Sequence, residues 1–529
     1  MHNSKKISLF KMKPSGEIFL LIKSMTGKEK LFFRKKYLTL IEDADKNYLK
    51  LFDEISKQTL KGDEYDENEI KAGKYTGKFI KNFSFHKNFL YNSILNALLI
   101  FNRDNKDIFA IRNLTTQAEI LADRLLNEQS LKLLQKVKKA SQQKDLFNNL
   151  YEIINTERLI KKYSTNVEEY ILNSKELFDE QYKVLELNKN LLDYYTLNEN
   201  VGIFLRNQGS GRIREKDKHL EFEKIFESPL LKNFENAKSF LAKYIFYNLK
   251  IQYYLTNENF EEAYNYAKSA VELCENNFEK LKGKLDNYIF ALNNLLNCQS
   301  RSYRYNESEI TAAKLKSIAG DYPEMITELN KVFIFYSLSV LLLSKNIAVI
   351  DIKKLRLLET EIMDELTLYE HKITIYQRII LYFFLSVSNF IQNNFEKCIY
   401  WNSKIFNIGK TDLSEDYQCY ARIIQLISYY ELGYFDSMDY ALKSAYHFIS
   451  KKKKVYKYEI IIQKFLRRSF SIKTDKELIK MFGEMKDELE EIYKDDFEKN
   501  AFDAFNILYW LDSKINGKSV LEILKEKLN

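Results

Sequence analysis

Proline and glycine are scarce in this chain, with three prolines and fourteen glycines among 529 residues. Sheets and sandwiches need frequent turns built from these residues, whereas helices can be joined by short breaks of Asn, Asp and Ser. The scarcity argues against β architectures and predicts an all-α protein. The 37 tyrosines and 37 phenylalanines supply large side chains for many helix–helix contacts.

Cysteine and histidine are also sparse, and neither forms a recognisable catalytic or metal-binding motif. The five histidines do not pair locally with a Cys, Ser or acidic residue, and there is no His-Glu-x-x-His, calcium loop or dinucleotide fingerprint. We therefore expect no metal, no cofactor and no enzymatic activity, while a site assembled from distant residues stays open. The cysteines form no Cys-x-x-Cys pair and are predicted to be buried thiols in a reducing cytosol: Cys274, Cys298, Cys398 and Cys419.

Long apolar runs are absent. A membrane-spanning helix needs about 20 apolar residues, and the nearest approach, Val332 to Leu343, is interrupted by Ser and stops at Ser344 and Lys345. The run Ile18 to Ile22 is too short for the core of a signal peptide, and no small-residue cleavage site follows it. We expect a cytoplasmic protein without a membrane span.

Positive charge is unevenly distributed. Residues 1–36 hold ten Lys or Arg against Glu17 and Glu29, which accounts for the whole net charge of +8. The remaining 493 residues carry 72 basic and 72 acidic side chains. The amino-terminal segment is therefore a candidate contact for an acidic partner, and the alternative is a solvated terminus.

Two short helices are predicted in this segment, from Ser15 to Ile22 and from Lys28 to Tyr37, and Thr26 with Glu29 forms a capping box before the second. The pair resembles a helix-turn-helix, but no Arg, Asn or Gln series follows one face to read base edges. Nucleic-acid binding is thus an alternative function. Its basic patch comprises Lys28, Lys30, Arg34, Lys35 and Lys36 near the amino terminus, and Lys451, Lys452, Lys453, Lys454, Arg467 and Arg468 farther along.

Three segments carry apolar and charged positions that resemble an uncharacterised family of large helical bacterial proteins: Asn47 to Phe52, Tyr65 to Glu67 and Lys87 to Tyr91. The resemblance covers roughly residues 15 to 105. The family has no assigned activity, so the resemblance implies a helical region and a bacterial source but no catalytic residue.

The breaks in the apolar pattern predict five regions. They are a basic helical region (1–103), a region of long helices (104–207), a loop and connector (208–234), a repeat region (235–449) and carboxy-terminal capping helices (450–529). The connector begins with the glycine-rich Gln208 to Arg212. It lacks the Lys and the preceding strand of a phosphate-binding loop and is interpreted as a flexible loop.

The segment Val167 to Arg206 contains no Pro, and its first Gly is Gly202. It is either one long helix or two helices, and the polar cluster Asn198-Glu199-Asn200 favours a break. Pairing with a second chain as a coiled coil stays open, although the apolar spacing is too irregular for a sustained heptad.

Similar short segments recur in the repeat region. Asn259 to Ala263 matches Asn394 to Cys398 and, more loosely, Tyr434 to Met438, and each has an aromatic residue in its second position. This arrangement resembles the two-helix unit of the tetratricopeptide repeat, which has an aromatic residue just after the turn and a small residue three positions later. The resemblance implies a right-handed solenoid of helical hairpins over residues 235–449.

The spacing of the matched segments sets the expected number of repeats. Phe260 and Phe395 are 135 residues apart, close to four times the usual period of about 34 residues. Two degenerate units are expected between them, at Leu281 to Ile318 and at Pro323 to Leu366.

These features predict a non-catalytic interaction scaffold. The first helix of each hairpin would line a concave groove that binds a peptide or a partner protein. The alternative is a regulatory protein that binds nucleic acid through the basic patch or senses a peptide. The oligomeric state stays open. Candidate groove residues are Asn248, Gln252, Asn389, Gln392 and Gln425.

Overall fold

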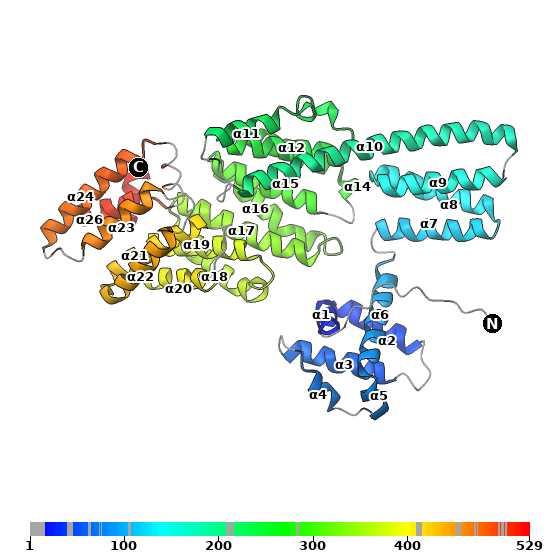
Figure 1. Cartoon of the computed structure of the whole chain (residues 1–529), viewed down its shortest axis with the longest axis horizontal. Coiled ribbons are helices and arrows are strands. Elements are labelled where there is room, and N and C mark those ends of the chain that lie inside the picture. Colours follow the sequence, from blue (N-terminus) through cyan, green and yellow to red (C-terminus); the bar gives the residue numbers. More distant parts are fainter. Residues whose placement is uncertain are drawn as a thin grey trace. The chain divides into compact units, whose positions relative to one another are not determined.

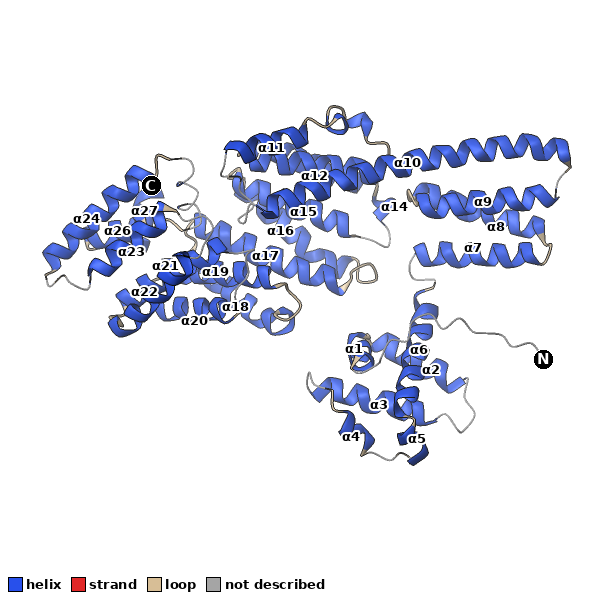
Figure 2. Ribbon diagram, in the orientation of Figure 1, coloured by secondary structure: helices blue, strands red, loops and turns tan. Residues whose placement is uncertain are grey.

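The structure is a computed structural model in which every described regular element is a helix (Figures 1 and 2). Helices pack mainly against their neighbours in the chain, and the prediction of an all-α protein is confirmed. Contacts divide the chain into two compact units, the first made of residues 1–141 and 152–177 and the second of 142–151 and 178–529. The described residues are 16–39, 46–61, 65–72, 75, 77–103, 107–164, 166–207, 213, 216–281, 285–408, 415–450, 456–469, 472, 474–495, 498, 502 and 505–528.

The first unit opens with six helices around a small apolar core. Helices α1, α3 and α6 contact one another, and α2 packs on α6. The predicted capping box of α2 is confirmed, because Thr26 N donates to Glu29 Oε2 (2.7 Å) and Glu29 N donates to Thr26 Oγ1 (3.3 Å). The helices are α1 (Glu17–Ser24), α2 (Gly27–Thr39), α3 (Lys46–Lys61), α4 (Glu67–Lys71), α5 (Gly77–Lys81) and α6 (Phe83–Asn102).

Four longer helices follow: α7 (Asp107–Asp123), α8 (Asn127–Gln143), α9 (Phe147–Ser164) and α10 (Val167–Asn207). Helix α10 is one helix of 41 residues, so the predicted break at Asn198 is wrong. Polar residues on an exposed helix face cost only a few tenths of a kcal/mol each. The buried side of α10 continues past the polar cluster, with Tyr194 before it and Val201 after it. This packing keeps the helix intact.

The second unit is built mainly from five helical hairpins. We call α12, α15, α17, α19 and α21 the first helices, and α13, α16, α18, α20 and α22 the second helices. Successive first helices also contact each other from α15 to α21. The predicted loop Gln208 to Arg212 lies outside the described residues. The elements are α11 (Lys216–Phe226), the 3₁₀ turns η2 (Pro229–Leu231) and η3 (Phe234–Asn236), α12 (Phe240–Thr256), α13 (Phe260–Asn276), α14 (Phe278–Leu281), α15 (Asp286–Arg301), α16 (Tyr305–Asp321), α17 (Glu328–Ala348), α18 (Ile352–Tyr369), α19 (Ile375–Ile391), α20 (Phe395–Asn407), α21 (Glu415–Glu431) and α22 (Phe435–Ser450).

The same three-residue turn joins the helices of all five hairpins, and it also joins α7 to α8 and α8 to α9. Its middle residue is left-handed, which ends the first helix. In six of these turns the backbone N–H of the residue after the left-handed one donates to the carbonyl oxygen of the residue five positions before it, at 2.8 to 3.0 Å. This is the 6→1 bond of a Schellman motif. The middle residues are Leu125 (φ 61°), Asp145 (53°), Glu258 (56°), Tyr303 (59°), Ile350 (55°), Asn393 (56°) and Gly433 (70°).

The turns correct the expected repeat period. The three segments matched in the sequence do follow equivalent turns, since Asn259, Asn394 and Tyr434 each come directly after a left-handed residue. Two further turns lie between the first and second of these, at Tyr303 and Ile350. The left-handed residues of the hairpins, from 258 to 433, are therefore 45, 47, 43 and 40 residues apart. Phe260 and Phe395 are therefore separated by three steps, which agrees with the two units expected between them but not with four periods of about 34 residues.

The turn also fixes which side of the second helix is buried. The residue five positions after the left-handed one is buried in all seven turns, although its size varies widely. Because the break always has the same length and geometry, the second helix starts with the same rotation each time. These residues are Ser130, Leu150, Ala263, Ser308, Leu355, Cys398 and Met438.

The largest described core runs from α17 through the carboxy-terminal helices. Helix α19 is apolar on nearly all sides and is buried from Ile379 to Ile391 except at Phe384, as expected for a helix inside a core. Helix α17 is the single described helix that is long and apolar enough to cross a membrane, and half of its most apolar segment is buried. In the structure α17 packs on α16, α18 and α19.

Four carboxy-terminal helices complete the second unit within the described residues. Lys464 and Arg468 of α23 pair with Glu488 and Glu484 of α24, at 2.9 and 2.7 Å. Glu431 of α21 holds α26 by accepting bonds from that helix. The helices are α23 (Lys457–Ser469), α24 (Asp475–Ile492), α26 (Leu508–Asn516) and α27 (Val520–Leu528).

Alanine substitution should have opposite effects at Gly433, which is left-handed, and at Gly483, which lies inside a helix. Gly433→Ala should lower the free energy of unfolding by about 1 kcal/mol, because a Cβ is unfavourable in the left-handed conformation even though no atom lies within 4 Å of it. Gly483→Ala, inside α24 and equally open, should raise it by about 0.5–1 kcal/mol. Urea denaturation followed by circular dichroism checks both, and a stabilising Gly433→Ala would contradict the turn geometry.

Candidate functional site

A cavity of about 480 Å³ lies between the second helices α18 and α20, with the end of α19 between them. Its lining combines charged, amide and aromatic side chains, which suits a polar ligand group better than a purely apolar one. The lining residues are Arg356, Glu359, Thr360, Met363, Asp364, Asn389, Gln392, Asn394, Lys397, Tyr400 and Trp401.

Glu359 is the buried acid of this cavity, with 7% of its surface exposed. Its Oε1 accepts from Asn389 Nδ2 (3.1 Å) and from Trp401 Nε1 (3.4 Å), and Lys397 Nζ lies 3.2 Å from the same oxygen. Burying a carboxylate without such partners is costly. No described group donates to Oε2. That oxygen can accept a hydrogen bond from a bound molecule.

The rim of the α18–α20 cavity is held by a second set of bonds. Arg356 Nε donates to Gln392 Oε1 (3.0 Å), and Gln392 Nε2 donates to Ser388 O (3.1 Å). The exposed side chains of Met363 and Tyr400 add apolar surface. The cavity therefore offers acceptors, donors and an aromatic ring to one ligand.

A second cavity of about 310 Å³ lies on the other side of α18, between α16 and α18 with α17 as its floor. Its floor is apolar and includes Phe335 and Leu338 of α17. Charged residues form the rim, where Lys316 and Glu361 come within 3.4 Å across the two helices. Burial raises the pKa of the Glu365 carboxyl, Glu361 raises it further, and Lys316 opposes the shift. The apolar floor suits a hydrocarbon side chain.

The five predicted groove residues do not form a single site. Asn389 and Gln392 line the α18–α20 cavity, but Asn389 is buried. Asn248 accepts from Asn294 Nδ2 (3.1 Å), and Gln425 donates to Tyr429 Oη (2.8 Å), so both amides bond within the chain. Gln252 is half-buried on α12 and lines neither cavity.

The predicted basic patch is divided between the two units. In the first unit, Arg34 is bound to Asp53 (2.6 Å), and burial followed by the nearby Arg34 lowers the pKa of Lys30. In the second, Arg468 pairs with Glu484 while Arg467 is exposed. Lys28 and Lys35 are exposed, Lys36 is half-buried, and Lys451, Lys452, Lys453 and Lys454 lie outside the described residues.

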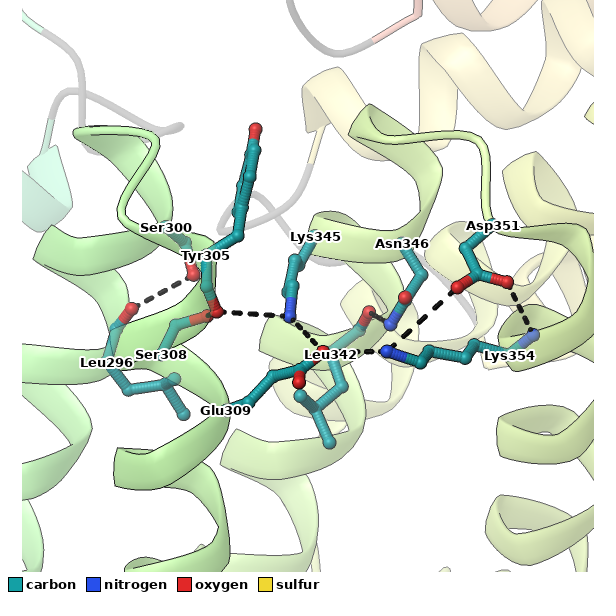
Figure 3. A network of polar contacts seen from close by, with 10 residues as sticks. All are labelled: Leu296, Ser300, Tyr305, Ser308, Glu309, Leu342, Lys345, Asn346, Asp351 and Lys354. Atoms are coloured by element: carbon teal, nitrogen blue, oxygen red, sulfur yellow. Dashed lines mark hydrogen bonds and ion pairs between the residues drawn. The ribbon is translucent and has the colours of Figure 1, made fainter.

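A polar network links three helices beside the hairpin turns (Figure 3). Lys345 of α17 has only 4% of its side chain exposed, and its Nζ donates to Glu309 Oε1 (2.9 Å) of α16. Lys354 of α18 donates to the same oxygen at 2.6 Å. These two lysines lower the pKa of Glu309 from 4.5 to about 2. The network stabilises the packing of α16, α17 and α18, the three helices that line the smaller cavity.

Sequence reasoning missed Glu359 and Lys345, although both carried a signal. Glu359 interrupts the apolar stripe of α18 between Leu355 and Ile362, and Lys345 interrupts that of α17 after Leu343. A charged residue at a core position must find a partner or a ligand. Their partners lie 30 to 42 residues away in the case of Glu359, and so they are invisible to local motifs.

Three of the four cysteines are poor nucleophiles in this structure. Burial raises the pKa of the Cys274 and Cys298 thiols to about 12 and raises that of Cys398 further. At neutral pH such thiols are protonated. Within the described part of the chain, no three His, Cys, Asp or Glu side chains come together as a metal site.

No protein-family model matches the chain, and no curated protein matches it. The resemblances to the tetratricopeptide repeat and to the bacterial helical family therefore stay predictions, and the site has to be interpreted from its own chemistry.

The Glu309 network predicts a pH-dependent stability. The pKa of Glu309 is lower in the folded chain, so its contribution is present above pH 4.5 and is lost as the pH falls toward 2. The stability difference between wild type and Glu309→Gln should therefore shrink over this range. Urea denaturation at several pH values checks it. Glu396→Gln, an exposed glutamate outside the network, is the control and should show no such trend.

Proposed function

We propose that the second unit is a tetratricopeptide-like solenoid that binds an extended segment of a partner protein and catalyses no reaction. In this proposal the segment crosses α18 and places one side chain in each flanking cavity. The supporting observation is the pair of unlike cavities that share α18 as a wall, one with an apolar floor and one with a buried carboxylate.

The two cavities favour different side chains. The α16–α18 cavity has room for a side chain such as Leu or Phe, and its charged rim suits the polar backbone beside it. The α18–α20 cavity suits a hydrogen-bond donor, because Glu359 Oε2 and the Asp364 carboxylate both accept. Tyr400 can pack on the aliphatic part of the same side chain. A segment with an apolar residue and a donor residue satisfies both.

The spacing of the cavities constrains the segment. They are separated by α18, and a helix with its side chains is about 10 Å across. An extended chain advances about 3.3 Å per residue. The two anchoring residues should therefore be at least about three positions apart. This separation distinguishes a peptide from a small molecule, which would fill one cavity only.

This proposal moves the binding surface from the predicted one. A concave groove on the first helices would use Asn248, Gln252 and Gln425, whereas the two cavities are bounded by second helices. The first helices α17 and α19 contribute the floors. The proposal keeps Asn389 and Gln392 in the site, where Asn389 positions Glu359 rather than facing solvent.

Nucleic-acid binding is the weaker alternative. Electrostatic binding requires cations that can release counterions from phosphates. Lys464 and Arg468 are paired with acids on α24, and Arg34 is paired with Asp53. These pairs reduce the positive potential that a phosphate backbone would meet.

Peptide selection tests the proposed function. Peptides selected from a random library displayed on phage should bind the purified chain. The substitution Thr360→Trp, which fills the α18–α20 cavity, should weaken the binding of these peptides at least about tenfold. Fluorescence anisotropy measures both affinities. The matched control is Leu357→Trp, an exposed residue of α18 that lines neither cavity. Equal losses in the two variants, or no specific peptide at all, would contradict the proposal.

Fluorescence anisotropy with labelled DNA and RNA tests the alternative. Because the described cations at Arg34 and Arg468 are paired, we expect no binding at physiological salt and at most weak, strongly salt-dependent binding at low salt. Tight binding that persists at physiological salt, and that is lost when Lys28 and Lys35 are changed to Gln, would favour a nucleic-acid role instead.

A further inference from the structure

Helix α10 carries two apolar stripes, of which one is buried and the other is exposed. The first stripe is turned inward and includes Leu177, Val184 and Leu191. The second is displaced by one residue and begins with Ile171 and Phe178. Each stripe repeats every seven residues by itself. Together they look irregular in the sequence.

The second stripe is exposed along the whole helix. Successive members are spaced four and three residues apart from Ile171 to Ile203, which is the spacing of heptad positions d and a. All of them belong to one continuous helix, so helix geometry alone places residues with this spacing along one face. The large apolar members are Ile171 (63% exposed), Phe178 (43%), Tyr182 (66%), Leu185 (45%), Leu192 (62%) and Ile203 (52%).

We propose that the chain forms a homodimer in which α10 pairs with α10 of a second copy in antiparallel orientation. The stripe is self-complementary in one register, where each d residue faces an a residue of the other copy. This register pairs the stripe over its full length, from Ile171 to Ile203, and it places Lys175 opposite Glu199. The facing pairs are Ile171 with Ile203, Lys175 with Glu199, Phe178 with Thr196, Tyr182 with Leu192, and Leu185 with Lys189.

A parallel dimer fits the same stripe poorly. It would place Lys175 against Lys175, Lys189 against Lys189 and Glu199 against Glu199 in the interface, and like charges at facing positions are destabilising. In the antiparallel register Lys189 instead lies beside Leu185, where its aliphatic stem can cover the leucine while its ammonium group reaches water. Lys175 and Glu199 are both exposed on α10, and among the described residues no ion pair joins either of them to its own chain. The second copy supplies the missing partner.

Sedimentation equilibrium of the full chain tests the dimer. The wild type should be a concentration-dependent dimer, and Leu192→Glu should raise the dissociation constant by at least about tenfold, because each dimer loses two buried leucines. The matched control is Leu172→Glu, which introduces the same charge at a comparably exposed leucine outside the stripe and should leave the dimer intact. A monomeric wild type, or equal dissociation of both variants, would overturn the proposal.

A charge exchange tests the antiparallel register. Lys175→Glu and Glu199→Lys should each weaken the dimer by bringing like charges together, and the double variant should restore the wild-type dissociation constant. In a parallel dimer the double variant would still face like charges and would stay weak. Failure to restore the dimer would therefore overturn the register. Unchanged circular dichroism confirms that each variant is folded.

Discussion

The helical array depends on one backbone constraint, the left-handed residue that ends a helix and allows the next one to begin two residues later. The 6→1 hydrogen bond closes the turn, and the fixed length of the break sets the rotation of the second helix. All seven described turns have the left-handed residue, six of them have the 6→1 bond, and their middle residues include Leu, Tyr and Ile. A side chain with a Cβ is disfavoured there by about 1–2 kcal/mol. The local hydrogen bond and the apolar packing of the hairpins together offset that cost.

This explains how much of the fold the sequence could predict. The helix content followed from the scarcity of turn residues, and the turns at Glu258, Asn393 and Gly433 were visible because similar residues follow them. The turns at Tyr303 and Ile350 carry no glycine or asparagine in the left-handed position. Their geometry comes from packing rather than from preference, so the repeat period was misjudged. The same reasoning placed a break in α10, where polar residues lie on a solvent face and require none.

The site was predictable only in part, because its chemistry is assembled across hairpins. Asn389 and Gln392 were chosen as polar residues of a first helix, and they do line a cavity. The residue that gives the cavity its character is Glu359, which was recognisable as a charge in an apolar stripe. Its donors come from α19 and α20. No periodicity in one helix predicts which residue of another will reach it, and this is why Trp401 went unnoticed.

The proposed pairing of α10 with a second copy requires this long helix to be unbroken. Its inward stripe needs only local contacts and would tolerate a kink, since each turn packs separately on its neighbours. The exposed stripe is different. If it pairs with a second copy, residues near one end must meet residues near the other, so a single break at Asn198 would rotate Glu199 and Ile203 away from Lys175 and Ile171 of the second copy. The absence of proline throughout the helix, and of glycine before Gly202, is then a requirement of the pairing rather than a consequence of helix preference alone.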